Sequence, residues 1–142
     1  MKKVLFALAL MLMGGMAYGQ RVMNVQHLKT TDLGNQRLEA AIDNGDTTYV
    51  ITLATGNRFQ KRISFVLGDK ERALKLLQWM YDYEPRGGDI IDLENPSDNA
   101  ATYSGINGYT IYSEGRQLKG HLRKQNIRGF IKTIKEYAGI AE

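Results

Sequence analysis

The amino-acid sequence predicts an α+β domain, in which an antiparallel sheet of hairpins carries two amphipathic helices on one face. Three observations support this fold class. Short runs of alternating apolar and polar residues are separated by tight-turn dipeptides, and two longer segments repeat apolar residues every three or four positions. The links between the predicted strands are also too short for parallel crossovers. The strands therefore pair as antiparallel hairpins, and the apolar helix faces need one side of the sheet as their partner.

The first segment, residues 1–19, is predicted to be a secretory signal peptide. Lys2 and Lys3 precede an apolar stretch and then small residues, with cleavage expected before Gln20. The segment resembles the signal peptides of exported Gram-negative proteins. Its apolar stretch is shorter than the roughly 18 to 20 residues that span a bilayer as a helix, and no cysteine follows for lipid attachment. We therefore expect an exported protein, periplasmic or extracellular, with no transmembrane anchor.

The remaining segment, residues 20–142, is predicted to be a single α+β domain. Removing 19 of the 142 residues leaves 123, which is enough for one self-sufficient core. Two of the 19 basic residues leave with the leader and no acidic one does, so 17 remain against 15 acidic residues, a net charge of about +2. A charge this small gives no general attraction to polyanions, and we expect no nucleic-acid partner. The chain has no cysteine, which excludes thiol nucleophiles, thiolate metal sites and disulfides.

The first strands are predicted to form a hairpin over residues 37–54. Asn44 and Gly45 separate its two alternating runs, and both residues tolerate the positive φ angles of a type I′ turn. A second turn at 55–57 returns the chain through a third strand. The apolar positions of that strand fall at mostly even spacing: Phe59, Ile63, Phe65 and Leu67. These segments predict a three-stranded antiparallel meander.

A helix is predicted next, over residues 70–83. Asp69 can accept hydrogen bonds from the free amide groups of the first turn, and Pro85 ends the segment. One apolar stripe runs along the helix: Ala73, Leu74, Leu77, Met80 and Tyr81. This stripe is expected to face the sheet.

Three short strands are predicted over residues 101–123. Asn107 with Gly108, and Glu114 with Gly115, mark two tight turns between apolar runs. The second half of the chain therefore begins with hairpins, as the first half does.

A last helix is predicted over residues 126–138, with Gly139 suited to its C-terminal cap. Its apolar side consists of Ile127, Phe130, Ile131, Ile134 and Tyr137. The chain thus runs strands, helix, strands, helix, and LKLL (74–77) resembles IKTI (131–134). The order and the short match suggest an internal β-β-α duplication.

An acidic segment over residues 89–98 offers hard oxygen ligands that would suit calcium: Asp89, Asp92, Glu94 and Asp98. Its spacing lacks the D-x-D-x-D-G framework that wraps a chain around the ion. We expect instead that Ile90, Ile91 and Leu93 form a short strand or anchor the crossover to the core, with the acids in water. Calcium is then expected to leave the melting temperature unchanged.

No catalytic, cofactor-binding or metal-binding residue is assigned from the sequence. His27 and His121 lie far apart, and the chain has no HExxH, GxSxG, P-loop or GxGxxG motif. His121 is expected on the solvent face of its strand. Two scattered carboxylates could still serve a small hydrolase, because the separation of a catalytic pair is a property of the fold.

Basic residues of the last helix form one candidate partner surface, named the basic stripe. Its members recur at steps of four, four and three, opposite the apolar side: Lys124, Arg128, Lys132 and Lys135. Three residues of the preceding hairpin extend it: Arg116, Lys119 and Arg123. Such a stripe attracts an acidic polysaccharide, lipid headgroups or an acidic protein, although lysine and arginine also face water on ordinary amphipathic helices.

Trp79 and Tyr83 form the second candidate partner surface. They are four residues apart, so a helix places them together on a flank, whereas Tyr81 follows the apolar stripe. Such a pair commonly marks the border of a core, but its flat faces also suit a sugar or a protein partner. The predicted function is therefore a noncatalytic binding or accessory domain of the cell envelope. The alternatives are a small carboxylate-dependent hydrolase and a structural subunit of an envelope complex.

Overall fold

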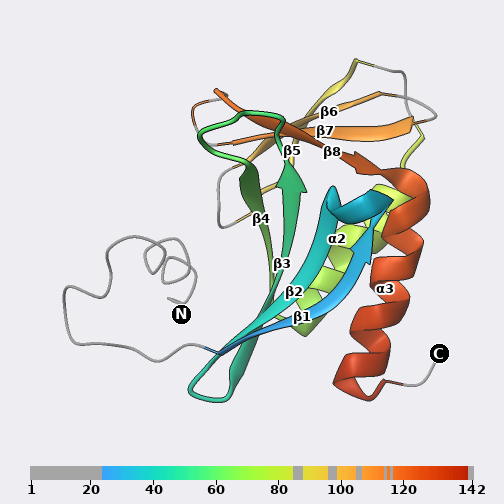
Figure 1. Ribbon diagram of the computed structural model, residues 1–142. Helices are drawn as coiled ribbons and strands as arrows, with labels where there is room; N and C mark the ends of the chain where they lie inside the picture. The colour runs from blue at the N-terminus through green and yellow to red at the C-terminus, as the bar shows by residue number, and fades with distance from the viewer. Residues whose placement is uncertain are drawn as a thin grey trace.

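The computed structural model describes residues 24–84, 88–95, 99–104, 107–113, 115 and 117–140 (Figure 1). The predictions made for residues 1–19 and for Pro85, Asp98, Glu114 and Arg116 fall outside this part of the chain. The strands are β1 (Asn24–Thr31), β2 (Gln36–Asp43), β3 (Asp46–Ala54), β4 (Arg62–Gly68), β5 (Ile90–Asp92), β6 (Ala100–Tyr103), β7 (Gly108–Tyr112) and β8 (Lys119–Arg123). The helices are the short 3-10 helix η2 (Asp32–Gly34), α2 (Lys70–Asp82) and α3 (Lys124–Ala138).

The described strands form two four-stranded antiparallel sheets, in the orders β1-β2-β3-β4 and β5-β6-β7-β8. α2 follows the first sheet and α3 follows the second, which confirms the predicted α+β class. The sequence predicted one sheet, whereas the structure has two, because each strand pairs with its neighbour in the chain and α2 separates β4 from β5. The second sheet lies across one end of the first (Figure 1). Four strands and a helix thus occur twice, and an internal duplication stays a prediction.

The turn between β2 and β3 is the predicted one. Asn44 and Gly45 have φ angles of 52° and 86°, and Asp43 pairs with Asp46 on either side of them. The register that follows buries one face of the two strands, which carries Leu38, Ala40, Tyr49, Ile51 and Leu53. The alternation in the sequence therefore identified the core face of this hairpin.

Both predicted helices are confirmed, with small differences at their ends. The Asp69 carboxylate accepts a hydrogen bond from the Arg72 backbone N–H at 2.9 Å, and α2 ends at Asp82, one residue before the predicted end. α3 begins at Lys124, two residues earlier than predicted, and Gly139 caps it with a φ of 75°. Their buried residues lie on the predicted stripes: Ala73, Leu77, Met80, Ile127, Phe130, Ile131 and Ile134. Neither α2 nor α3 is long and apolar enough to cross a membrane.

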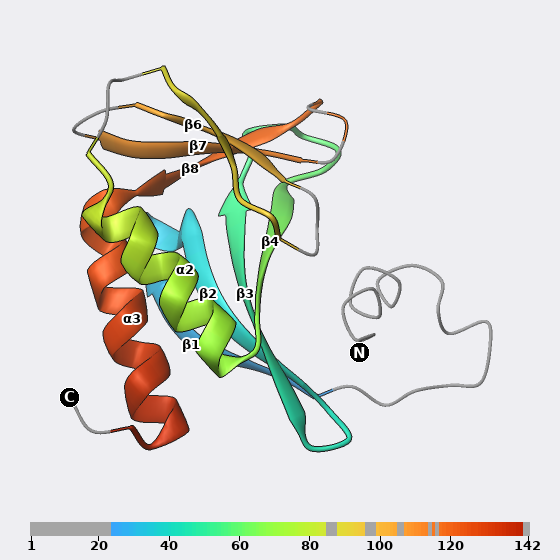
Figure 2. The same ribbon diagram turned by 180° about the vertical axis from the view of Figure 1, so that it is seen from behind.

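The main core lies between the first sheet and the two helices. α2 contacts β3 and β4, α3 contacts β1, and the two helices contact each other. Figure 2 shows both helices on the same face of the first sheet. Buried residues of the second sheet close the core at one end: Ala101, Tyr103, Tyr109, Ile111 and Leu122. A separate small cluster consists of Ala41, Val50 and Val66, which alternate with the core positions along β2, β3 and β4.

Two buried amides join the second sheet to the first. Asn99 donates from Nδ2 to the carbonyl oxygens of Ser64 in β4 (3.3 Å) and Tyr112 in β7 (2.9 Å). Gln36 in β2 accepts at Oε1 from the backbone N–H of Arg123, at 3.3 Å. Because both amides are buried, the bonds from Asn99 to Ser64 and from Arg123 to Gln36 fix one sheet against the other.

A glycine allows the sheets to approach closely. Gly120 in β8 lies against Leu53 in β3, and a β-carbon at position 120 would be 2.5 Å from that of Leu53. Any larger residue there would force β8 away from β3, so this position depends on the absence of a side chain.

Two parts of the first sheet differ from the prediction. β1 was not predicted, because most of its side chains are exposed and Leu28 is the residue that packs against the main core. The placement of Phe59 in a strand is wrong, since β4 begins at Arg62 and Phe59 lies in the preceding loop. The Asn57 side-chain oxygen accepts from the backbone N–H groups of Phe59 (2.8 Å) and Gln60 (3.0 Å), which turns the chain before the strand starts.

Candidate functional site

The C-terminal end of α2 brings Trp79 and Tyr83 into contact. Tyr83 caps the helix, and its backbone N–H donates to the Trp79 carbonyl oxygen at 3.0 Å. This turn stacks the two rings, with centroids 4.5 Å apart and planes inclined by 24°. Trp79 keeps 45% of its surface exposed. The pair of rings is named the aromatic platform.

Two tyrosines of the second sheet hold the aromatic platform from the inside. Tyr83 meets Tyr103 edge to face at 5.6 Å between centroids, and Tyr103 meets Tyr109 at 5.1 Å. Tyr103 and Tyr109 are direct cross-strand partners on β6 and β7, and both are buried. The Tyr109 hydroxyl donates to the Met80 carbonyl oxygen at 2.6 Å. The row of rings therefore connects the exposed Trp79 to the interior of the domain.

Burial raises the pKa of Tyr109, and the neighbouring hydroxyls of Tyr103 and Tyr83 raise that pKa further. Desolvation also raises the pKa of Tyr83, followed by the charge of Asp89 and a hydrogen bond from the Tyr83 hydroxyl to that carboxylate. Both phenols are therefore protonated at neutral pH and act as neutral hydrogen-bond donors.

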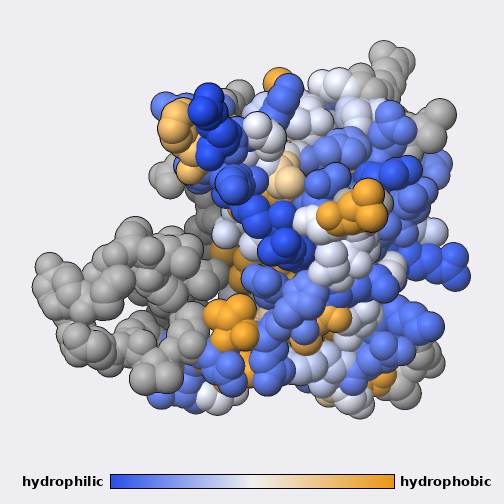
Figure 3. Space-filling view, viewed as in Figure 1, coloured by the Kyte–Doolittle hydropathy of each residue, from blue (hydrophilic) through white to orange (hydrophobic). Residues whose placement is uncertain are grey.

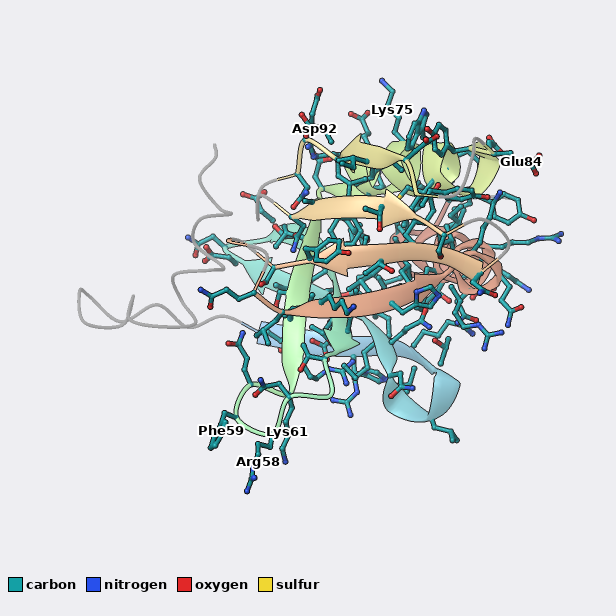
Figure 4. All side chains as sticks on the ribbon, turned by 90° about the horizontal axis from the view of Figure 1, so that it is seen from above. Arg58, Phe59, Lys61, Lys75, Glu84 and Asp92 are labelled. Atoms are coloured by element: carbon teal, nitrogen blue, oxygen red, sulfur yellow. The ribbon has the colours of Figure 1, made fainter. Side chains whose placement is uncertain are left out.

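Lys124, at the start of α3, lies at one edge of the aromatic platform. Its Nζ donates to the Tyr83 carbonyl oxygen at 3.0 Å and lies 3.8 Å from the Glu84 carboxylate. The same Nζ is 5.8 Å from the centre of the Tyr103 ring, and only 17% of the lysine side chain is exposed. Glu84 points outward at this edge of the molecule (Figure 4).

A shallow depression beside Lys124 completes the site. Its lining carries charges of both signs: Tyr81, Asp82, Glu84, Lys124 and Gln125. The Asp82 carboxylate accepts from the Gln78 side-chain amide at 3.1 Å, so the acidic side chain is held in place on the helix. The site thus combines an exposed aromatic face with an ordered, charged edge.

The four residues of the predicted basic stripe all lie on α3 but differ in their surroundings. Lys124 belongs to the edge of the aromatic platform, where its ammonium group is already paired. Farther along α3, Arg128 and Lys132 are exposed and Lys135 is half-buried. Two cations of the stripe, Arg128 and Lys132, are therefore exposed, whereas the Lys124 ammonium group is paired at the edge of the aromatic platform.

The outer face of β8 carries the other basic residues of this region. Lys119, His121 and Arg123 alternate with two buried residues and are exposed, as predicted for His121. His27 lies on β1, with its Nδ1 3.7 Å from the Glu39 carboxylate and its Nε2 2.5 Å from the Thr30 hydroxyl. The two histidines are placed on different sheets and share no site.

The acidic segment contains the short strand that the sequence predicted. Ile91 and Leu93 are buried, whereas Ile90 is exposed. The Asp92 carboxylate accepts a hydrogen bond from the Glu94 backbone N–H at 2.9 Å, and this bond shapes the turn after β5. Within the described part of the chain, no group of three or more histidine or acidic residues is placed to hold a metal ion.

A search of protein-family models, of curated proteins and of solved structures found no match to this chain. The sequence identified Trp79 and Tyr83 as a pair, but it did not identify Lys124, Tyr103 and Tyr109 as their supports. A two-residue turn at Asn107 and Gly108 would have paired Tyr103 with Tyr112. The structure instead begins β7 at Gly108 and pairs Tyr103 with Tyr109, so the predicted turn gave the wrong cross-strand partner. Nothing in the sequence predicted the contact between the β6–β7 hairpin and α2.

Proposed function

We propose that this chain is an exported, noncatalytic binding domain of the cell envelope, and that its aromatic platform docks on an envelope protein. The observation that carries the proposal is the state of Trp79, which is 45% exposed and yet stacked on Tyr83. Tryptophan and tyrosine are enriched among the residues that dominate binding energy at protein interfaces. Because the stack already restricts the indole, less side-chain entropy is lost when a partner covers it.

The surroundings of the aromatic platform favour a protein over an acidic polysaccharide. Asp82, Glu84 and Lys124 place both signs of charge beside the rings. A polyanion would gain from Lys124 but would meet two carboxylates at the same edge. An apolar centre with a mixed polar rim is instead the common arrangement of a protein interface.

The hydrolase alternative has less support, because three of the carboxylates with described contacts serve the fold. Asp69 caps α2, Asp92 shapes the turn after β5 and Asp89 accepts the Tyr83 hydroxyl. The structural-subunit alternative is compatible with the same surface, and it differs in predicting a permanent complex of fixed stoichiometry.

The test is affinity capture of the tagged full chain from the envelope fraction of its native cells. We expect Trp79→Ala to weaken the captured complex at least about thirtyfold, which corresponds to roughly 2 kcal/mol at a hot-spot residue. Ile90→Ala is the matched control, because Ile90 is also a large exposed apolar residue but lies outside the aromatic platform. Capture should also persist at high salt, since apolar docking is not screened. Equal capture by the wild type and the Trp79→Ala variant would refute the proposal.

A further inference from the structure

The loop between β3 and β4 exposes an aromatic side chain. Phe59 has 88% of its surface in solvent, next to Arg58 and close to Lys61. The Arg58 guanidinium carbon lies 5.4 Å from the centre of the Phe59 ring. Figure 4 shows these three side chains projecting together from one side of the molecule, away from Glu84. The loop therefore presents one apolar ring between two cations, at a distance from the aromatic platform.

This loop is ordered by its own hydrogen bonds. The Thr55 hydroxyl donates to the Gln60 carbonyl oxygen at 2.6 Å and accepts from the Asn57 backbone N–H at 3.0 Å. The Asn57 side chain accepts from two further backbone N–H groups of the loop. An exposed phenylalanine on such a loop is held outward by the fold.

A second apolar side chain stands on the connection between β1 and β2. Leu33 is fully exposed and has a φ of 58°, in the left-handed region that leucine seldom adopts. Arg62 holds this connection, because its guanidinium donates to the carbonyl oxygens of Gly34 (2.8 Å) and Thr52 (2.8 Å). The residue is therefore fixed in an exposed position, as Phe59 is.

Leu33 and the Phe59 loop flank one depression. Its lining includes Leu33, Asn35, Thr55, Gly56, His121 and Arg123. The surface around it is mainly hydrophilic, with separate hydrophobic groups (Figure 3). Leu33 thus lines a polar hollow, and the loop that carries Phe59 lines the same hollow through Thr55 and Gly56. The two apolar side chains are therefore not parts of one flat apolar patch.

Positive charge is concentrated around the same hollow. The Arg37 guanidinium lies beside Gly34. Burial, followed by the charge of Arg37, lowers the pKa of Arg62 against the opposing effect of Glu39. Arg58 and Lys61 add two exposed cations on the loop. An anionic partner would relieve the repulsion between these cations.

We propose that this face docks on the surface of an anionic phospholipid bilayer, with Phe59 and Leu33 inserted among the headgroups and the neighbouring cations on the lipid phosphates. Interfacial binding requires both elements, since buried apolar area and attraction to anionic lipid act together. Each lysine or arginine near such a surface contributes about fivefold in affinity. A hydrated polysaccharide would leave both apolar tips in water, so it explains the cations but not Phe59 or Leu33.

The test is co-sedimentation of the full chain with vesicles of equal parts phosphatidylglycerol and phosphatidylcholine, compared with vesicles of phosphatidylcholine alone. The sedimentation is repeated with the chain that begins at Gln20, because the basic and apolar residues 1–19 would themselves bind an anionic bilayer. We expect binding to the anionic vesicles, and a loss of at least about tenfold in Phe59→Ala and in Leu33→Ala. Ile90→Ala is the matched control and should bind as the wild type does, because Ile90 is also a large exposed apolar residue but belongs to neither proposed surface. Circular dichroism spectra should be unchanged in all variants, because the substituted side chains are exposed.

A second measurement reports insertion directly. The chain has one tryptophan, so a variant carrying Trp79→Phe and Phe59→Trp places the only indole at the loop. Its emission should shift to the blue when anionic vesicles are added, and should not shift with phosphatidylcholine alone. Unchanged emission, vesicle binding that Phe59→Ala and Leu33→Ala leave intact, or binding to polygalacturonate in place of the vesicles would each overturn the proposal. Failure here would leave the aromatic platform untouched, because the two surfaces share no residue.

Discussion

Replacing Tyr109 with phenylalanine removes one hydroxyl group at the point where the two halves of the domain meet. The hydroxyl donates at 2.6 Å to the Met80 carbonyl oxygen, near the end of α2. The last carbonyl groups of a helix have no hydrogen-bond donor within the helix, and the Tyr109 hydroxyl supplies a donor from the second sheet. The ring itself is retained by the substitution, and its contact with Tyr103 is kept.

The expected cost at neutral pH is about 1 to 3 kcal/mol of unfolding free energy, because a buried acceptor loses its donor. For a domain of this size each kcal/mol corresponds to roughly 3 to 5 °C in melting temperature. Tyr109→Phe should therefore melt several degrees below the wild type, and its urea midpoint should fall without a change in m-value.

The same substitution should change the response to alkaline pH. Burial raises the pKa of Tyr109 above the ordinary 10.0 of an exposed phenol. Below pH 10.0 the phenol is protonated in both states, so its contribution to stability is fully present. Above that pH the unfolded chain releases the phenolic proton while the folded chain retains it. The free energy of unfolding therefore falls by up to about 1.4 kcal/mol per pH unit for this tyrosine.

Urea denaturation followed by circular dichroism at neutral pH and at roughly pH 11 tests both effects. The wild type should lose stability above pH 10.0, and Tyr109→Phe should lose less over the same interval. Tyr49, whose pKa burial also raises, stays in the variant and accounts for part of the remaining slope. Identical midpoints at neutral pH and parallel pH profiles would refute the role assigned to the Tyr109 hydroxyl.

Gly120→Ala should destabilise the domain by about 1 to 3 kcal/mol in thermal unfolding, since the new β-carbon would lie 2.5 Å from that of Leu53; an unchanged melting temperature would show that the sheets do not approach so closely. Asn99→Ala should cost about 1 to 3 kcal/mol in urea unfolding because two carbonyl groups lose a buried donor, and a cost near zero would contradict the bridging role. Millimolar calcium should leave the melting temperature unchanged, whereas a rise of several degrees that Asp89→Ala abolishes would reveal a calcium site. N-terminal sequencing of the exported protein should begin at Gln20, and retention of Met1 would contradict the predicted leader.

The features that the sequence predicted best are those decided by one or two residues. The Asn44–Gly45 turn, the Asp69 cap and the Gly139 cap each follow from a local backbone preference or a short side-chain bond. The apolar faces of the two helices could be predicted almost as directly, because the period of a helix fixes which side chains share a face.

The features that it missed depend on the rest of the fold. β1 is an edge strand held by backbone pairing to β2, and its mostly exposed side chains need no alternation. Phe59 lies an even number of positions before the apolar residues of β4, as a residue on the same strand face would. This spacing has a meaning only where the chain is extended, and Asn57 turns the chain at Phe59. The way in which the two sheets meet likewise rests on long-range contacts at Gln36, Asn99 and Gly120.

The candidate site shows the same division. Helical spacing predicted that Trp79 and Tyr83 lie together, and in the structure the centroids of their rings are 4.5 Å apart. Lys124 was predicted as part of a basic surface, since its place in the sequence gives no sign that α3 starts beside the end of α2. Its pairing with Tyr83 and Glu84 is a product of tertiary packing.

The most direct test of the proposed docking role is acrylamide quenching of Trp79, the only tryptophan of the chain, with and without the envelope protein recovered by capture. The free protein should be quenched readily, because the indole is 45% exposed. In the complex the quenching constant should fall severalfold and the emission should move to the blue. A quenching constant that is the same in the complex as in the free protein would contradict the proposal that the partner covers the aromatic platform.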